Sequence, residues 1–86
     1  MSRISCVIHT LSSKQEIEPA DMILLPGAKG ELGVLYNHAP TIVELKEGFI
    51  RTYKDEALAN EVKIEGGIAY IKADIIEIFS TPRFIF

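Results

Sequence analysis

Few side chains in this sequence could act as a nucleophile, a general base or a metal ligand. The 86 residues hold one cysteine, Cys6, and two histidines, His9 and His38. Cys6 and His9 lie three residues apart on an expected strand, so their side chains point to opposite faces and cannot form a nucleophile–base pair. Metal sites use three or four ligands. We therefore expect no metal site, with Cys6 in the core and His9 as a polar residue at a strand end.

His38 and Glu31 are the polar residues that a loop could present to a ligand or a partner. His38 stands beside Pro40 in an expected turn, where its ring either acts on a ligand or hydrogen-bonds its own loop. Glu31 lies between Gly30 and Gly33, and we expect it at the tip of a glycine-flanked turn. A carboxylate at such a tip either contacts a basic or amide side chain of a partner or simply faces solvent.

No segment carries a nucleotide-binding or hydrolase motif. Gly27, Gly30 and Gly33 lie close together, but no Lys-Ser or Lys-Thr follows them as in a P-loop. No Gly-Xaa-Ser-Xaa-Gly elbow is present either. The glycines instead indicate positive φ or close backbone approach. The pair Gly66-Gly67 falls inside a strand pattern and predicts a bulge, or a place where another backbone packs closely. We expect no bound cofactor.

Length and composition predict one globular domain over residues 1–86. Hydrophobic residues make up 48% of the chain and charged residues 24%, which favours a packed core over disorder. The formal net charge is −3. A negative chain lacks the basic surface that nucleic acids and anionic lipids attract, so we expect neither as a direct partner.

The N-terminal residues and the cysteine count bear on where the chain works. A lone cysteine cannot form an intrachain disulfide, so nothing calls for an oxidising compartment. The first residues form neither an apolar signal segment nor a basic amphipathic presequence. No apolar run approaches the roughly 20 residues that span a bilayer. We expect a soluble, cytosolic chain that reaches a membrane only through a partner.

Short apolar stretches with a period of two predict an all-β fold. Ile4, Cys6 and Ile8 alternate with more polar residues, and no segment keeps a 3.6-residue period over three turns. We expect 46–48 to be a tight hairpin connection, and the polar residues 54–60 to form a loop or one helical turn. Eight to ten strands of this kind are typical of a sandwich or barrel. The first expected strand begins at Ile4 and ends near residues 11–13, and residues 21–25 form either a strand covered on both faces or a short helical turn. The other expected strands are residues 15–18, 34–36, 41–45, 49–53, 62–65, 68–71 and 75–79.

Residues 30–41, which read Gly-Glu-Leu-Gly-Val-Leu-Tyr-Asn-His-Ala-Pro-Thr, resemble the signature of epsilon subunits of F-type ATP synthases, called delta in mitochondria. In that family a Gly-Glu-Leu-Gly turn leads to His-Ala-Pro, then to an apolar strand and a glycine-turned hairpin. Gly48-Phe49-Ile50-Arg51 fits that hairpin, and residues 66–71 resemble the double-glycine strand of the family. The resemblance covers roughly residues 4–80 in order and spacing.

The resemblance implies a flattened β-sandwich of about ten short, mostly antiparallel strands. It also implies a non-catalytic rotor subunit in the central stalk of a proton-transporting F-type ATP synthase. Such a subunit links gamma to the c-ring and helps couple ion translocation to ATP synthesis. The implied partners are gamma, the c-ring and, within the assembly, the alpha/beta catalytic head. The implied location is the cytoplasmic side of the bacterial inner membrane, with membrane contact only through the complex.

The site residues implied by the resemblance are two turns. The turn that would face the c-ring is Gly30, Glu31, Leu32 and Gly33, and the turn that would face gamma is His38, Ala39, Pro40 and Thr41.

The chain departs from the family pattern in three places. Tyr36-Asn37 replaces the usual Pro-Gly before the histidine, and because Asn tolerates left-handed backbone we expect the turn to persist. Ser80-Thr81-Pro82 replaces the usual Ala-Asp and small residue after the last strand. The C-terminal helical hairpin of the family is not among these 86 residues. We therefore expect neither inhibition of ATP hydrolysis nor ATP binding by that route.

Two other classes of function stay open at the level of the sequence. One is a free-standing small β-sandwich that binds a ligand or peptide, for which a pocket lined by aromatic residues is expected. The other is a small hydrolase that uses Cys6 or His38, which needs a nucleophile, a base and an orienting group. The apolar tail Phe84–Phe86 is expected to dock on its own fold or on a partner.

Overall fold

The computed structural model describes residues 2–80, which form nine strands and no helix. This confirms the all-β prediction and its range of eight to ten strands. The tail Phe84–Phe86, for which docking was expected, lies outside the described residues. The strands are β1 (Ile4–His9), β2 (Lys14–Ala20), β3 (Met22–Gly27), β4 (Gly30–Leu35), β5 (Thr41–Leu45), β6 (Gly48–Lys54), β7 (Ala57–Ile64), β8 (Gly67–Ile71) and β9 (Ile75–Ser80).

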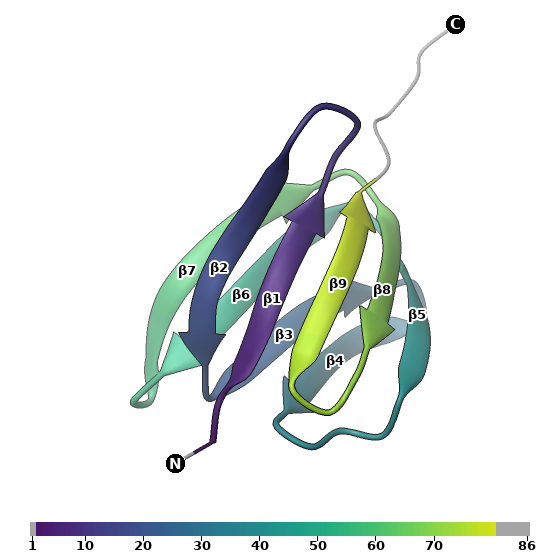
Figure 1. Cartoon of the computed structure of the whole chain (residues 1–86). Helices are drawn as coiled ribbons and strands as arrows, with labels where there is room; N and C mark the ends of the chain where they lie inside the picture. Colours follow the sequence, from purple (N-terminus) through teal and green to yellow (C-terminus); the bar gives the residue numbers. More distant parts are fainter. Residues whose placement is uncertain (1, 81–86) are drawn as a thin grey trace, which may run out of the picture.

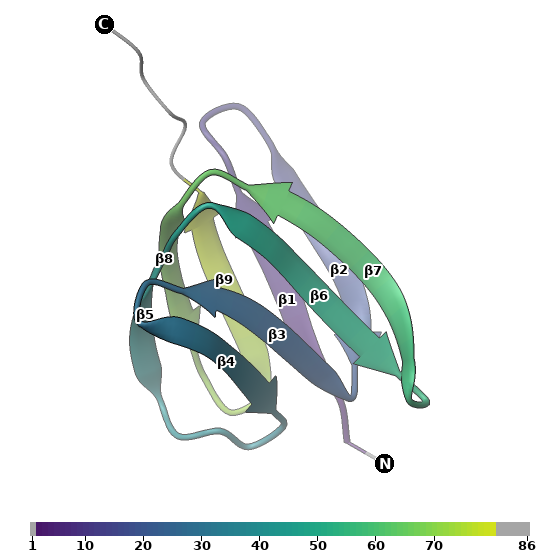
Figure 2. The same cartoon turned by 180° about the vertical axis from the view of Figure 1, so that it is seen from behind.

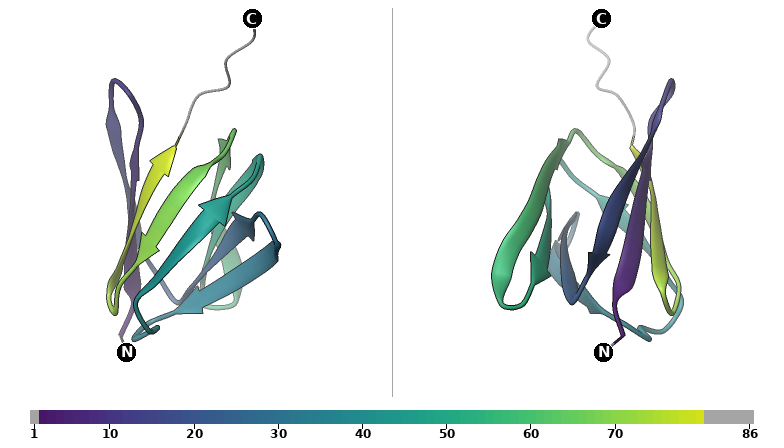
Figure 3. Two further views of the ribbon diagram at one scale, coloured as in Figure 1. Left: turned by 90° about the vertical axis from the view of Figure 1, so that its right-hand side faces the viewer. Right: turned by 60° about the vertical axis from the view of Figure 1, so that its left-hand side comes forward.

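The strands lie in two layers that face each other (Figures 1 and 3). Strands β2, β1, β9, β8 and β5 form one layer in that order, and β7, β6, β3 and β4 form the other, seen from behind in Figure 2. The layers are joined at a corner, where β5 pairs with β3 through Leu45 and Gly27. Every recorded pairing is antiparallel except that of β1 with β9. The flattened, mostly antiparallel sandwich is therefore confirmed.

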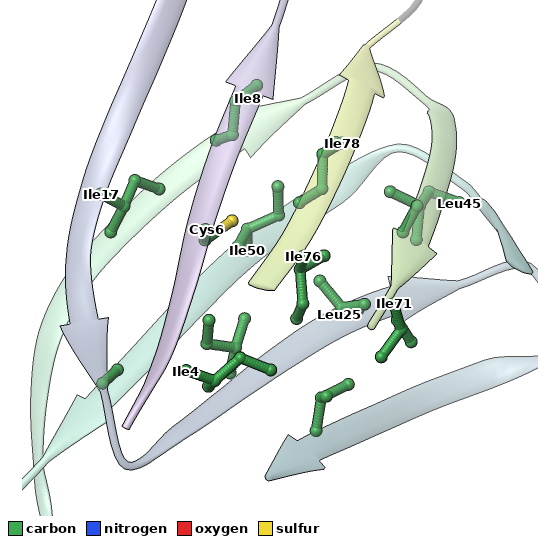
Figure 4. Close-up of a cluster of buried hydrophobic side chains, with 14 of the residues drawn as sticks. Ile4, Cys6, Ile8, Ile17, Leu25, Leu45, Ile50, Ile71, Ile76 and Ile78 are labelled. Atoms are coloured by element: carbon green, nitrogen blue, oxygen red, sulfur yellow. The ribbon is translucent and has the colours of Figure 1, made fainter. Parts of the chain in front are cut away.

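The core lies between the layers and consists mainly of isoleucine (Figure 4). Alternation places it there, because successive side chains of a strand point to opposite faces. In β1 the predicted apolar residues Ile4, Cys6 and Ile8 are buried, whereas the residues between them are half-buried. The largest fully buried side chains come from both layers, so each layer covers the apolar face of the other. They include Ile4, Ile23, Leu25, Ile50, Ile71, Ile76 and Ile78.

Two connections differ from the sequence-based expectation. Residues 46–48 do not close a hairpin, because β5 pairs with β8 while β6 pairs with β3 and β7. The segment instead carries the chain from one layer to the other, and the Lys46 amide donates to the Pro26 carbonyl at 2.9 Å as it crosses. Leu45 and Ile50 both reach the core, but from opposite layers, and a flat hairpin could not achieve that.

The polar residues 54–60 are also not a loop or a helical turn. Asp55 and Glu56 both have positive φ, 54° and 65°, and they close a tight turn between Lys54 and Ala57, after which β7 begins. Two consecutive positive φ values match the right-handed twist of the paired strands. The segment is rich in polar residues because β7 lies at the edge of its layer and exposes most of its length to solvent.

An ion-pair network fastens this turn to the N-terminal part of the chain. The Asp21 carboxylate accepts a hydrogen bond from the Asp55 amide at 2.7 Å and one from Arg3 Nε at 3.0 Å. The Asp21 amide in turn donates to the Tyr53 carbonyl at 2.9 Å. The hydrogen bond from Asp55 and the Arg3 guanidinium lower the pKa of the Asp21 carboxyl. The network therefore joins the start of β1, the β2–β3 connection and the β6–β7 turn.

We expect Asp21→Asn to lower stability at neutral pH and to flatten the acid side of the stability curve. The pKa of Asp21 is lower in the folded chain than the roughly 3.9 of an unfolded aspartate. The stability that the Asp21 carboxylate contributes is therefore fully present at pH values above the unfolded pKa, and it is lost as the pH falls through the folded pKa. Urea unfolding at a series of pH values from 7 to 2 measures this change in the free energy of unfolding. The control Glu18→Gln, at an exposed position of β2, should have the same dependence of stability on pH as the parent chain. If Asp21→Asn also has the parental dependence, the network does not have the role that we assign to it.

Candidate interaction surface

The cysteine and the first histidine are held apart, as the sequence predicted. Cys6 is buried in the core, whereas His9 ends β1 on the opposite, outer face. Burial away from water raises the pKa of the Cys6 thiol to about 12. Because the thiolate is the reactive form, this thiol is a poor nucleophile at neutral pH. Residues 2–80 also contain no group of three or more His, Cys, Asp or Glu side chains that could hold a metal ion.

We expect the Cys6 thiol to be almost unreactive in the folded chain. Burial both raises its pKa and blocks access, so labelling by a water-soluble disulfide reagent should proceed only through unfolding. The measurement compares labelling rates at pH 7.5 in buffer and in denaturing urea. A fast rate in buffer would show that Cys6 is accessible and that the core opens locally around β1.

The second histidine hydrogen-bonds its own loop, one of the two alternatives left open by the sequence. His38 Nδ1 lies 2.7 Å from the Ala39 carbonyl oxygen, which also accepts a hydrogen bond from the Thr41 hydroxyl at 2.8 Å. Asn37 adopts the left-handed conformation with φ of 66°, as expected where it replaces glycine. The backbone N–H of Asn37 donates to the Ala73 carbonyl at 2.6 Å, which ties this loop to the β8–β9 turn.

Glu31 does not lie at the tip of a turn. The turn residues are Ala28 and Lys29, and Gly30 pairs with Gly27 to open β4. Glu31 is therefore the second residue of β4, opposite Pro26, and its side chain is exposed. The prediction of a ring-facing turn at residues 30–33 is wrong in its local structure, because all four residues belong to the strand. Gly30 does have the expected positive φ, 133°, whereas Gly33 does not.

The outer face of β5, β8 and β9 carries apolar side chains in neighbouring rows. Register places Ile42 beside Tyr70 in one row, and Ile68 beside Phe79 in the next. All four are exposed, Ile42 by 67%. A shallow hollow of about 390 Å³ lies among Ile68, Tyr70 and Phe79, with Lys72 and Glu77 at its rim. We call Ile42, Ile68, Tyr70 and Phe79 the apolar face.

Aromatic contacts and charges give this face a defined shape. The His9 ring stacks on Phe79 with centroids 4.6 Å apart, and Tyr70 meets Phe79 edge-on at 5.6 Å. Glu77 lies within 3.6 Å of His9 Nε2 and within 3.7 Å of the Lys72 ammonium. Rings that pack against one another lose little conformational freedom when a partner covers them. The charged side chains lie at the margin of the face, as they do in protein interfaces. The arrangement is typical of a protein-binding surface.

Single-sequence reasoning missed the apolar face because its residues are far apart along the chain. Three strands, β6, β7 and β8, lie between Ile42 and Phe79 along the chain, and only the pairing of β5 with β8 and of β8 with β9 brings the two residues together. One local signal was available. Residues 68–71 are apolar on both faces of the strand, Ile68 and Tyr70 pointing outward while Ala69 and Ile71 are buried. A strand that is apolar on both faces needs a cover on each.

Both segments that the resemblance singled out border β5. The loop of His38 to Pro40 runs directly into β5, one residue before Ile42. A groove of about 460 Å³ is lined by Gly30, Glu31 and Leu32 together with Ile42 and Glu44. The structure therefore places one predicted segment at the start of β5 and the other across a groove from this strand.

Comparison with known proteins agrees with this architecture. Residues 4–81 match the family described as "ATP synthase, Delta/Epsilon chain, beta-sandwich domain". The ATP synthase epsilon chain of Granulibacter bethesdensis is 47% identical over 71 residues, which is 83% of this chain and 53% of that protein. The mitochondrial F(1) complex subunit delta of Dictyostelium discoideum is 42% identical over 55 residues, 64% of this chain and 32% of that protein.

A solved structure of the same shape comes from the mitochondrial ATP synthase of Euglena gracilis, an assembly described as OSCP/F1/c-ring. The match has a TM-score of 0.81 at 22% identity, and it covers 93% of this chain and 51% of that chain. The chain thus spans about half the length of the epsilon chain from Granulibacter. No helix among the described residues is long and apolar enough to cross a membrane. The chain belongs to the beta-sandwich domain family of ATP synthase delta and epsilon chains.

Proposed function

We propose that this chain works as a non-catalytic rotor part of the central stalk of a proton-transporting F-type ATP synthase. In this role it links gamma to the c-ring and helps couple ion translocation to ATP synthesis. The observation that carries the proposal is the apolar face, an exposed set of supported side chains on a domain of the delta and epsilon family. A β-sandwich also suits a part that transmits torque, because its two closely packed layers deform little.

Gamma is the partner that we assign to the apolar face. The loop of His38 to Thr41 borders this face through Ile42, so one partner can cover both. Aromatic side chains surrounded by a polar margin are typical of the residues that dominate binding energy. The c-ring is assigned to the side of Glu31, whose exposed carboxylate can contact polar ring loops. The alpha/beta head is then a partner only within the assembly.

Membrane association follows from the complex in this proposal. The chain would lie at the cytoplasmic side of the bacterial inner membrane, held there by gamma and the ring. Its net charge of −3 gives it no attraction of its own for anionic lipid.

Co-purification tests the proposal directly. The tagged chain is expressed in its own organism, and the membranes are solubilised in mild detergent before affinity capture. Stoichiometric recovery of gamma and of the catalytic head is the expected result. A chain that is recovered alone from the cytosol would overturn the rotor role, and binding of a free ligand or peptide would then be the function to test.

We expect Glu31→Ala to weaken the ring contact without unfolding the chain. Exposed substitutions usually change stability by no more than about 0.5 kcal/mol, and the loss of one exposed charge pair weakens binding only a few-fold, on the order of 1 kcal/mol. The amount of c-ring that is recovered with the tagged complex measures the first effect, and thermal unfolding measures the second. Glu18→Ala, an exposed acid on β2, is the matched control. An unfolded Glu31→Ala chain would show instead that Glu31 has a structural role.

A further inference from the structure

One ring nitrogen of His9 is covered from water and lacks a hydrogen bond. His9 ends β1, and its side chain as a whole is 28% exposed. Nε2 is nevertheless buried, and it has no hydrogen-bond partner among the described residues. Glu77 Oε1 lies 3.6 Å from Nε2, which is too long for a hydrogen bond. A covered polar atom without a partner is unfavourable, so the neutral ring is poorly accommodated at this position.

Charged side chains lie beside His9 on both neighbouring strands. Register places Lys14 of β2 next to His9, and the Lys14 ammonium lies 3.6 Å from the Glu16 carboxylate. On β9 one Glu77 oxygen faces His9, while the other lies 3.7 Å from the Lys72 ammonium. Both ammonium groups thus pair with a carboxylate, and Glu77 is the partner for a positive charge on His9. The hollow beyond the end of β1 does not include His9, and its charged side chains are Lys63 and Glu65.

Protonation of His9 strengthens two contacts at once. A positive imidazolium attracts the Glu77 carboxylate, and this attraction grows as water is removed from around the pair. The ring also lies flat on Phe79, with centroids 4.6 Å apart and planes inclined by 10°, and a cation is attracted to the face of an aromatic ring. Histidine side chains ordinarily change charge between about pH 5 and pH 8. The hold of His9 on Phe79 is therefore firmest at the acidic end of this range.

Phe79 lies where such a hold affects the apolar face. Its ring meets Tyr70 edge-on, register places it beside Ile68, and all three residues line the shallow hollow. His9 is not part of that lining and reaches the face only through Phe79. A ring that is already held in place loses less freedom when a partner covers it, so binding becomes tighter.

We propose that His9 is a positioning residue whose protonated form holds Phe79 and thereby makes the apolar face bind gamma more tightly as the pH falls. The inference rests on the proposed function, because it takes gamma as the partner of this face. Its consequence is a stalk contact that responds to the pH around the chain, although Phe79 itself carries no titratable group.

Calorimetry of purified gamma with the 86-residue chain at several pH values tests the proposal. Gamma has titratable groups of its own, so the quantity to compare between variants is the Kd at pH 8 divided by the Kd at pH 5.5. We expect this ratio to be about fivefold larger for the parent than for His9→Gln, which stays polar but cannot become charged. In the free parent chain, the NMR signals of the Phe79 ring should shift with the same midpoint as those of the His9 ring.

Two further variants separate the charge of His9 from a purely structural role. Glu77→Gln removes the carboxylate that faces Nε2 and should lower the ratio as His9→Gln does. His38 is the other histidine of the chain, and it hydrogen-bonds its own loop. His38→Gln should therefore keep the parental ratio, whatever its effect on the affinity itself. Amide NMR spectra at both pH values check that each variant is folded.

The possible outcomes distinguish this inference from the proposed function. A parental ratio in His9→Gln, or a ratio lowered equally in His38→Gln, would overturn the role of His9 while gamma still binds and the rotor role stands. Absence of gamma binding at every pH would overturn both. A ratio that falls in His9→Gln and Glu77→Gln but not in His38→Gln supports the inference.

Discussion

Replacing Gly67 by alanine is expected to lower the free energy of unfolding by about 3 kcal/mol. A Cβ at Gly67 would overlap the Phe79 carbonyl oxygen and come within 3.0 Å of Ser80 Cα, both of which are backbone atoms of β9. The φ of Gly67, 146°, adds conformational strain of about 1–3 kcal/mol for any other residue. A domain of this size has a total stability of only about 5–15 kcal/mol, so the variant should be severely destabilised.

Two glycine controls separate overlap from strain. Gly30 has φ of 133° but open space where a Cβ would stand, so Gly30→Ala reports strain alone, about 1–2 kcal/mol. Gly33 has neither a positive φ nor a close backbone neighbour, so Gly33→Ala should stay within about 0.5 kcal/mol of the parent. Urea unfolding of the three variants gives the order of their free energies of unfolding. A Gly67→Ala chain no less stable than Gly30→Ala would contradict the close approach of β8 and β9.

The double variant Ile42→Ser/Tyr70→Ser is expected to lose most of its affinity for gamma while it keeps its fold. The two side chains are cross-strand partners on the apolar face, and both are exposed in the isolated chain. Truncation of central apolar and aromatic contacts typically costs about 2 kcal/mol or more, which corresponds to about a 30-fold weaker Kd. Their removal should hardly change the unfolding free energy, because neither side chain contributes to the core.

The measurement is binding of purified gamma to the parent and variant chains by calorimetry. Leu58→Ser is the matched control, since Leu58 is an exposed apolar residue of β7 in the other layer. It should bind gamma with the parental affinity. Equal losses in Leu58→Ser and in the double variant would mean that gamma does not select the apolar face. Unchanged affinity in the double variant would remove the face from the gamma contact altogether.

The strands that were easiest to predict are those with one apolar and one polar face. The alternation of Ile4, Cys6 and Ile8 determined which side of β1 is buried, and the structure confirms it. Gly66 and Gly67 indicated a close backbone approach, and both have positive φ, 144° and 146°. In each case the signal is local, because the side-chain period and the φ preference of glycine act within a few residues.

The two connections that were mispredicted depend on distant contacts. Lys46 to Gly48 has the composition of a hairpin turn, but Leu45 and Ile50 must enter the core from opposite layers. The turn at Asp55 and Glu56 lacks glycine, and its positive φ values occur where Asp21, 34 residues earlier, accepts the Asp55 amide. Neither contact leaves a local pattern in the sequence.

By itself the sequence determined the fold class, most strands, the burial of Cys6 and the likeness to the delta and epsilon family. These depend on residue type and short spacings, which act locally. Tertiary structure alone decided that Ile42, Ile68, Tyr70 and Phe79 share one face, and that Glu31 lies in a strand beside a groove rather than on a turn. The physical reason is register: cross-strand neighbours are set by hydrogen bonding between segments that are far apart in the chain, and a shift of one residue would turn each side chain to the other face.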